Sequence, residues 1–201
     1  MSPEERHRFV ARLPIGQRIP FPSEGIPGWE IFPFEGDIQV KVLDEPVLPE
    51  PPRAGEQGPQ ECAGCQDPLR NAVWADDRWR VIHTGGPTGL PVVVLLCPLA
   101  HHDLSDLPAG LSAELGPMLQ RVERAILSLG GIARVHVNRW GDGGAHLHLW
   151  LVARPAGMMQ MRGTCLPIWD DEIPKAPEEE WRESMASLAA ALAAQGGKAY
   201  M

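Results

Sequence analysis

The stretch 145–154, Ala-His-Leu-His-Leu-Trp-Leu-Val-Ala-Arg, constrains the fold more than any other part of the chain. Apolar residues alternate there with His146, His148 and Trp150, and a period of two predicts a β-strand. Residues two apart share one face of a strand, so the two imidazoles and the indole are expected in one row. Neutral imidazole acts as a nucleophile, a general base or a metal ligand near neutral pH. The strand therefore indicates a chemical site, and the alternative is a half-buried strand whose histidines only form hydrogen bonds.

Composition narrows the class of protein. The chain has 201 residues, of which 44% are hydrophobic, and this suggests one core with additions. It contains no apolar run of about 18 residues, so no membrane partner is expected. Residues 1–12 are charged and lack an apolar signal segment, which favours a cytoplasmic protein. The net charge of −8 argues against a nucleic-acid polymer as partner and leaves room for a small ligand.

The chain divides into three predicted regions. About half of the 21 prolines fall in residues 1–60, and proline disfavours long helices and central strands. We therefore expect a proline-rich N-terminal arm and linker there, with an alternating stretch at 37–43 that could form a strand. Residues 61–155 are predicted to be the core domain. Residues 156–201 are predicted to be an irregular segment up to 175, followed by a C-terminal helix packed on the core.

The core is predicted to contain strands, then one long helix, then a hairpin. Strands are predicted at 71–75, 79–83, 90–97, 134–138 and 145–154. Apolar residues at helical spacing predict the long helix at 109–129, ended by Gly130-Gly131. A second helix is predicted at 178–195. This order favours an α+β fold with an antiparallel sheet of about five strands and one long helix.

Cys62-Ala-Gly-Cys65 has a spacing that suits metal chelation or thiol redox chemistry. Without a secretion signal, a disulfide framework is not expected. A redox pair usually opens a helix after a strand. The polar and proline residues on both sides of this pair favour a loop instead. Cys97 lies in an apolar run and is expected to be a buried thiol.

Together these segments resemble the histidine-triad (HIT) superfamily of nucleotidyl hydrolases and transferases, in its bacterial zinc-binding type. The resemblance covers about residues 61–155 and rests on the order of Cys62-x-x-Cys65, Cys97-Pro-Leu-Ala-His101, the long helix and His146-Leu-His148-Leu-Trp150. It implies a HIT-like fold and a hydrolase or transferase that acts on a phosphorus-containing, nucleotide-like small molecule. Members often form two-fold dimers, and the sequence is compatible with a homodimer.

The resemblance implies a structural zinc site formed by Cys62, Cys65, His101 and His146. Two thiolates and two imidazoles are a tetrahedral donor set that zinc prefers. His102 is the alternative to its neighbour His101. The other interpretation is that the cysteines are free thiols and His101 is a surface residue.

The resemblance also implies that His148 is the nucleophile that attacks phosphorus, and that Asn138, Trp150 and Asp142 lie against the substrate. Two of these depart from the family pattern. Trp150 replaces the third histidine, and indole has one N–H and cannot shuttle a proton. Asp142 replaces a glutamine, and its carboxylate would repel a phosphate. The alternatives are therefore a zinc-stabilised, non-catalytic ligand-binding or interaction module, and a zinc-dependent enzyme of another class.

Overall fold

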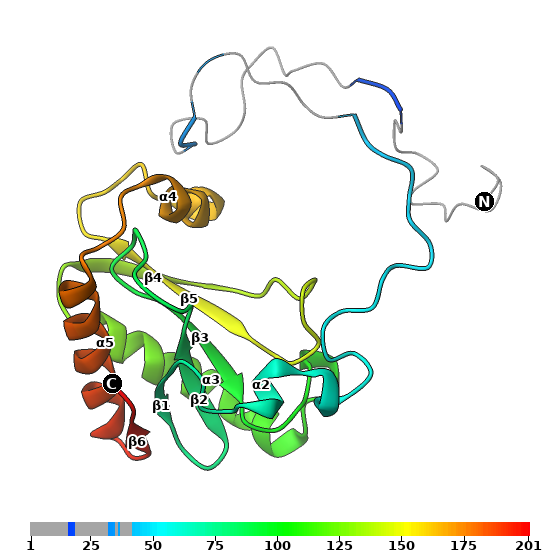
Figure 1. The fold of residues 1–201 in the computed structure, drawn as a ribbon. Coiled ribbons are helices and arrows are strands. Elements are labelled where there is room, and N and C mark those ends of the chain that lie inside the picture. Colours follow the sequence, from blue (N-terminus) through cyan, green and yellow to red (C-terminus); the bar gives the residue numbers. More distant parts are fainter. Residues whose placement is uncertain (1–15, 19–31, 35, 37–41) are drawn as a thin grey trace. The chain divides into compact units, whose positions relative to one another are not determined.

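The computed structural model describes residues 16–18, 32–34, 36 and 42–201 (Figure 1). The chain forms two compact units, Met1–Pro51 and Pro52–Met201. Much of the predicted arm, including most of the possible strand at 37–43, lies outside the described residues. The second unit begins at Pro52, inside the segment predicted as a linker. Among the described residues, no helix is both long and apolar enough to span a membrane.

The second unit is built on one antiparallel sheet of six strands, in the order β4-β5-β3-β2-β1-β6 (Figure 1). The strands are β1 Ala72–Ala75, β2 Trp79–His83, β3 Val93–Pro98, β4 Ile132–Asn138, β5 Leu149–Pro155 and β6 Lys198–Ala199. The predicted α+β class with an antiparallel sheet is thereby confirmed. The sixth strand, β6, has only two residues and pairs with β1, so it is too short to leave an alternating pattern in the sequence.

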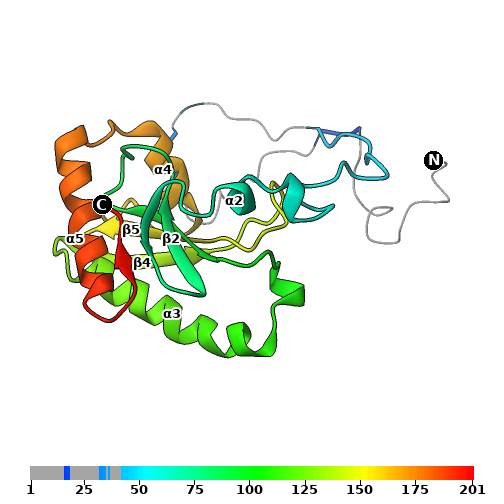
Figure 2. The ribbon, with the colours of Figure 1, turned by 60° about the horizontal axis from the view of Figure 1, so that its bottom comes forward.

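Helices α3 (Ala109–Leu127) and α5 (Glu178–Ala193) pack against one face of the sheet and contact each other (Figure 2). Both match the predicted helices, and α3 ends before Gly130 and Gly131, which have φ of 80° and 67°. The main core between them and the sheet includes Val94, Leu96, Leu151, Val122, Ile126, Met185 and Leu188, each less than 2% exposed.

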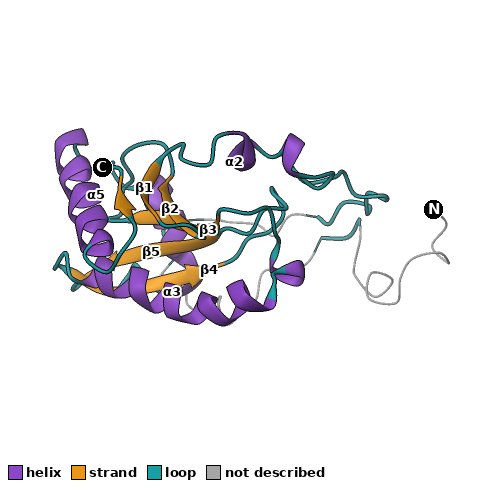
Figure 3. Ribbon diagram, turned by 90° about the horizontal axis from the view of Figure 1, so that it is seen from below, coloured by secondary structure: helices purple, strands orange, loops and turns teal. Residues whose placement is uncertain are grey.

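The other face of the sheet carries two short helices. Helix α2 (Ala63–Gln66) lies on the side opposite α3 in Figure 3. Helix α4 (Leu166–Glu172) covers a small second core made of Leu90, Val93, Val152, Met161 and Leu166. The prediction of an irregular segment up to residue 175 is therefore wrong for α4. This helix has only 7 residues and carries Pro167 in its first turn, a position that proline tolerates although it reads as a helix breaker.

The turn between α5 and β6 gives a first testable expectation. Gly197 has φ of 78°, and a Cβ atom there would lie 2.5 Å from Nε1 of the buried Trp74. We expect Gly197→Ala to lower the free energy of unfolding by about 2–3 kcal/mol, because it adds a clash and backbone strain. Gly143→Ala is the control, since Gly143 is exposed, has no positive φ, and its added Cβ meets nothing within 4 Å beyond its chain neighbours. That control should change the free energy of unfolding by less than about 1 kcal/mol. Urea denaturation measures both variants.

Candidate functional site

The hydrogen-bonded part of β5 begins at Leu149, so the predicted strand at 145–154 starts too early. The preceding residues pair with loops instead of a strand: Leu147 N donates to His102 O at 2.7 Å, and Ala145 N donates to Ala54 O at 3.0 Å. The alternation nevertheless persists. Leu147 and Leu149 are buried in the main core, while the next residues along, His148 and Trp150, remain half-buried.

Cys62, Cys65, His101 and His146 come together in one cluster, with all four ligand atoms within 4.8 Å of one another. Cys62 Sγ lies 3.5 Å from His146 Nδ1, and Cys65 Sγ lies 3.3 Å from the same atom. Cys65 Sγ is also 3.2 Å from His101 Nδ1. A tetrahedral zinc ion with Zn–S near 2.3 Å and Zn–N near 2.0 Å separates sulfur from nitrogen by about 3.5 Å. The spacing therefore fits such an ion.

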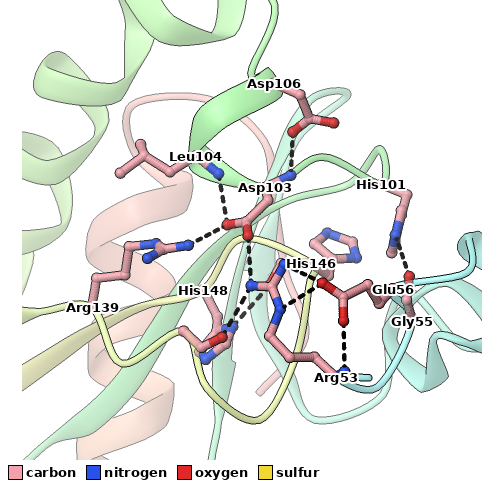
Figure 4. A network of polar contacts seen from close by, with 11 residues as sticks. Arg53, Gly55, Glu56, His101, Asp103, Leu104, Asp106, Arg139, His146 and His148 are labelled. Carbon is pink, nitrogen blue, oxygen red and sulfur yellow. Dashed lines mark hydrogen bonds and ion pairs between the residues drawn. The ribbon is translucent and has the colours of Figure 1, made fainter. Parts of the chain in front are cut away.

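Backbone carbonyls hold both imidazoles in the orientation that a metal ligand needs. His146 Nε2–H donates to Pro98 O at 2.8 Å. His101 Nε2–H donates to Gly55 O at 3.0 Å (Figure 4). With the proton on Nε2, the lone pair of each Nδ1 faces the cysteines. His102, the alternative to His101, is not a member of the cluster, and its Nδ1 lies 4.0 Å from the Asp106 carboxylate.

The cluster is buried enough to disfavour charge on its members. Burial lowers the pKa of His146 to about 4 and raises the pKa of the Cys65 thiol to about 11. A bound divalent cation would reverse this for the thiols, because metal binding displaces their protons. Arg80, which is 3% exposed, donates to Gly64 O and Pro68 O at 2.6 Å each and fastens the cysteine turn to the sheet. The sequence gives no sign of this role, since Arg80 only continues the alternation of β2.

His148 lies beside this cluster with one ring nitrogen fixed. Its Nδ1–H donates to the carbonyl oxygen of His146 at 2.8 Å. The proton on Nδ1 leaves Nε2 with a free lone pair. His148 also lines a largely apolar cavity of about 250 Å³, together with Ile82, Leu95 and Gly144. The arrangement places the imidazole ring of His148, fixed through Nδ1, beside a space that a small molecule can enter.

The remaining predicted substrate residues are placed differently. Asn138, at the end of β4, pairs across the sheet with Trp150. Trp150 is half-buried, and its ring centroid lies 5.7 Å from that of Trp140. Asp142 is exposed in the loop that precedes His146 and does not line the cavity beside His148. The fold thus brings Asn138 and Trp150 to the face of His148 and leaves Asp142 outside it.

A network of charged side chains holds the loop that precedes His146. The sequence does not reveal this network. Asp103 accepts from Arg53 Nη1 at 2.8 Å and from Arg139 Nη2 at 2.5 Å, and Arg53 also donates to Gly141 O at 3.0 Å (Figure 4). Burial alone would raise the pKa of Asp103, but the hydrogen bonds from Arg139 and Arg53 outweigh it and lower this pKa to about 2. The partners lie 36 and 50 positions from Asp103, so no local pattern signals the network.

We expect Asp103→Asn to lower the free energy of unfolding by about 1–3 kcal/mol, because two charge-assisted hydrogen bonds are weakened. Asp77→Asn is the matched control, since Asp77 is an exposed turn residue. Urea denaturation at neutral pH measures both. Equal stability losses in the two variants would contradict the role assigned to Asp103.

No family model matches the sequence, and no curated protein matches it. Solved structures do match the fold. A zinc-bound histidine triad family protein from Mycobacterium smegmatis has a TM-score of 0.50 and 24% identity, over 69% of this chain and 97% of its own. A hypothetical histidine triad nucleotide-binding protein from Sulfolobus tokodaii has a TM-score of 0.50 and 16% identity, over 65% of this chain and 91% of its own.

A histidine triad protein from Bradyrhizobium japonicum has a TM-score of 0.51 and 17% identity, over 63% of this chain and 95% of its own. Each of these proteins is matched over at least nine-tenths of its length. At these identities the likeness concerns the fold. The α+β fold of the histidine triad proteins, expected from the sequence, is the fold of this chain.

Proposed function

We propose that the protein is a histidine triad-type hydrolase or transferase that acts on a phosphorus-containing, nucleotide-like substrate through His148. The observation that carries this proposal is the hydrogen bond from His148 Nδ1–H to His146 O beside a cavity, because a neutral ring that donates from Nδ1 keeps its lone pair on Nε2. The fold supports the proposal, and one protein that shares it is described as nucleotide-binding. The cavity of about 250 Å³ has mostly apolar walls, which suit a nucleobase.

The proposed reaction has two steps at phosphorus. His148 Nε2 attacks phosphorus, a nitrogen–phosphorus bond forms, and the bond to the leaving group breaks with its electron pair. The imidazole ring then carries positive charge, which the carbonyl of His146 stabilises through the Nδ1–H bond. Water or an acceptor hydroxyl next attacks phosphorus, its proton passes to solvent water, and the electron pair of the broken nitrogen–phosphorus bond returns to Nε2.

Trp150 determines which leaving groups this site can serve. The indole N–H donates a hydrogen bond but does not transfer a proton near neutral pH. A leaving group that is stable as an anion, such as a phosphate, needs no proton from the protein. We therefore expect substrates that release a phosphate to turn over faster than those that release an alkoxide or an amine.

We further propose that Cys62, Cys65, His101 and His146 bind a structural zinc ion. The donor set, its sulfur–nitrogen distances of 3.2–3.5 Å and the carbonyl partners of both imidazoles support this. One protein of this fold is zinc-bound. Bound zinc would join the cysteine turn to the segment before β5 and so fix His146, whose carbonyl orients His148.

A non-catalytic binding module is the second candidate function. The indole of Trp150 in the third position, in contact with Trp140, favours it, because two aromatic rings form a binding surface without proton chemistry. A zinc enzyme of another class is less well supported. A catalytic zinc keeps one position open for water, whereas this cluster offers four protein donors.

A turnover assay separates these candidates. Zinc-replete protein is incubated with dinucleoside polyphosphates, nucleotide sugars and nucleoside phosphoramidates, and products are quantified by chromatography. The proposal expects turnover that is lost in His148→Ala and is fastest where a phosphate leaves. Binding without turnover of any substrate would favour the binding module.

A further inference from the structure

Two adjoining cavities lie on the face of the sheet that carries His148, beyond Trp150. The smaller, about 210 Å³, is lined by Val93, Trp140, Trp150, Val152, Pro167, Asp170 and Asp171. We call it the indole–carboxylate cavity. The larger, about 540 Å³, shares Val93, Trp150, Asp170 and Asp171 with it and continues along residues 84–88. Strand β5 supplies one side of the smaller cavity, and α4 supplies the other.

The first half of the indole–carboxylate cavity is aromatic. The rings of Trp140 and Trp150 have centroids 5.7 Å apart and planes inclined at 60°. Two indoles at such an angle form adjacent walls rather than a closed stack. Trp140 is 43% exposed, so part of its ring is open to solvent and to a ligand. The face of an indole attracts cations more strongly than that of any other side chain.

Two carboxylates stand at the edge of this largely apolar cavity. Asp170 is half-buried and accepts from Leu90 N at 2.8 Å, and the exposed Asp171 follows it on α4. Burial and the neighbouring Asp171 raise the pKa of Asp170. Neither carboxylate forms an ion pair with a basic side chain in the part of the chain that the structure describes. Lys175 lines only the larger cavity.

We propose that the indole–carboxylate cavity binds an alkylammonium group, preferably a methylated or quaternary one. Two indole faces and two carboxylates repel a phosphate and attract a positive charge. A quaternary ammonium has no N–H group and needs no hydrogen-bond acceptor, so it fits a cavity whose walls are largely apolar. A sugar of similar size would leave its hydroxyl groups against Val93, Val152 and Pro167 without partners.

The place of this group in the reaction rests on the proposed function. Trp150 follows His148 by two residues, which is about 6–7 Å along an extended chain. A phosphate that leaves from His148 would therefore carry its ester substituent toward Trp150. The inferred substrate class is a nucleotide whose leaving group is the phosphate ester of an alkylammonium alcohol.

The test measures how tightly choline binds to the full-length, zinc-replete protein in the absence of any nucleotide. Binding is measured by calorimetry or by tryptophan fluorescence at fixed ionic strength. The neutral isostere 3,3-dimethylbutan-1-ol has the same shape without the charge and is the matched ligand. We expect choline to bind at least about tenfold more tightly than the isostere, and Trp140→Ala and Asp171→Asn each to weaken choline binding about three- to tenfold. Glu172→Gln, which removes the next carboxylate on α4, is the control because Glu172 lines neither cavity.

Equal affinity for choline and the isostere, no binding of choline, or an equal loss in Glu172→Gln would each overturn the inference. Lys175→Met offers a second measurement that does not weaken the fold, since Lys175 is exposed. It removes a positive charge near Asp170 and should tighten choline binding, whereas an unchanged affinity would count against a cation in this cavity. If choline binds and no nucleotide is turned over, the cation site stands and the proposed function falls.

Discussion

His148→Ala should abolish turnover, with a loss of at least about 10⁴-fold, while the protein stays folded. The size of the effect follows from the role assigned to this residue, because removing a nucleophile removes the covalent route and not merely a contact. The half-buried His148 contributes one hydrogen bond, to His146 O, so the free energy of unfolding should change by about 1 kcal/mol or less. Steady-state kinetics and thermal unfolding of the same preparation measure both quantities.

His136→Ala is the matched control for that variant. His136 is a half-buried histidine on β4 and pairs with Val152, two residues beyond Trp150 on β5. Its side chain is half-buried, like that of His148, and has no role in the proposed chemistry. Its variant should retain turnover within a few-fold of the parent. A His148→Ala variant that kept more than a tenth of the parental activity would remove this residue as the nucleophile.

Loss of the metal should have the largest effect on stability. We expect one zinc ion per chain, and we expect Cys65→Ser to lose it and to lower the melting temperature by more than about 10 °C. Structural zinc contributes its binding free energy to folding, and Cys65→Ser removes one of the four donors that would hold the ion. Metal analysis by mass spectrometry and thermal unfolding by circular dichroism test the two parts separately.

Cys165→Ser provides the comparison, because Cys165 is a half-buried free thiol outside the cluster. It should keep a full complement of zinc and melt within a few degrees of the parent. Treatment of the parent with a strong chelator should reproduce the stability loss of Cys65→Ser and leave little further loss in that variant. A metal-free parent with an unchanged melting temperature would show that the four side chains do not form a structural metal site.

The sequence predicts the elements that have a long or strict period. The helix at 109–129 and the strand at 79–83 were identifiable because burial on one side imposes a spacing of 3.6 or 2 residues on the chain. β6, with two residues, and α4, with 7 residues and a proline in its first turn, are too short to show a period in the sequence. Alternation does not locate the start of β5, because it reports which face a residue occupies, whereas distant loops set its hydrogen-bond partners.

Some residues of the candidate site are also indicated by the sequence, and others are not. The resemblance to histidine triad proteins implies that Cys62, Cys65, His101 and His146 lie together, and the fold brings their ligand atoms within 4.8 Å of one another. The network of Arg53, Asp103 and Arg139 could not be foreseen, because charged surface residues are common and only tertiary structure aligns these three. The sequence does not indicate that Trp140 lies beside Trp150, because their proximity depends on the path of the loop after β4.

Trapping of the covalent adduct on His148 tests the central claim most directly. Protein is mixed with an excess of a substrate that it turns over, denatured within milliseconds in alkali, where a phosphorus–imidazole bond survives, and analysed by intact and fragment mass spectrometry. The account predicts a mass increase equal to one nucleotidyl group, located on His148 and absent from His148→Ala. Product formation without an adduct on His148, or an adduct on another residue, would contradict it.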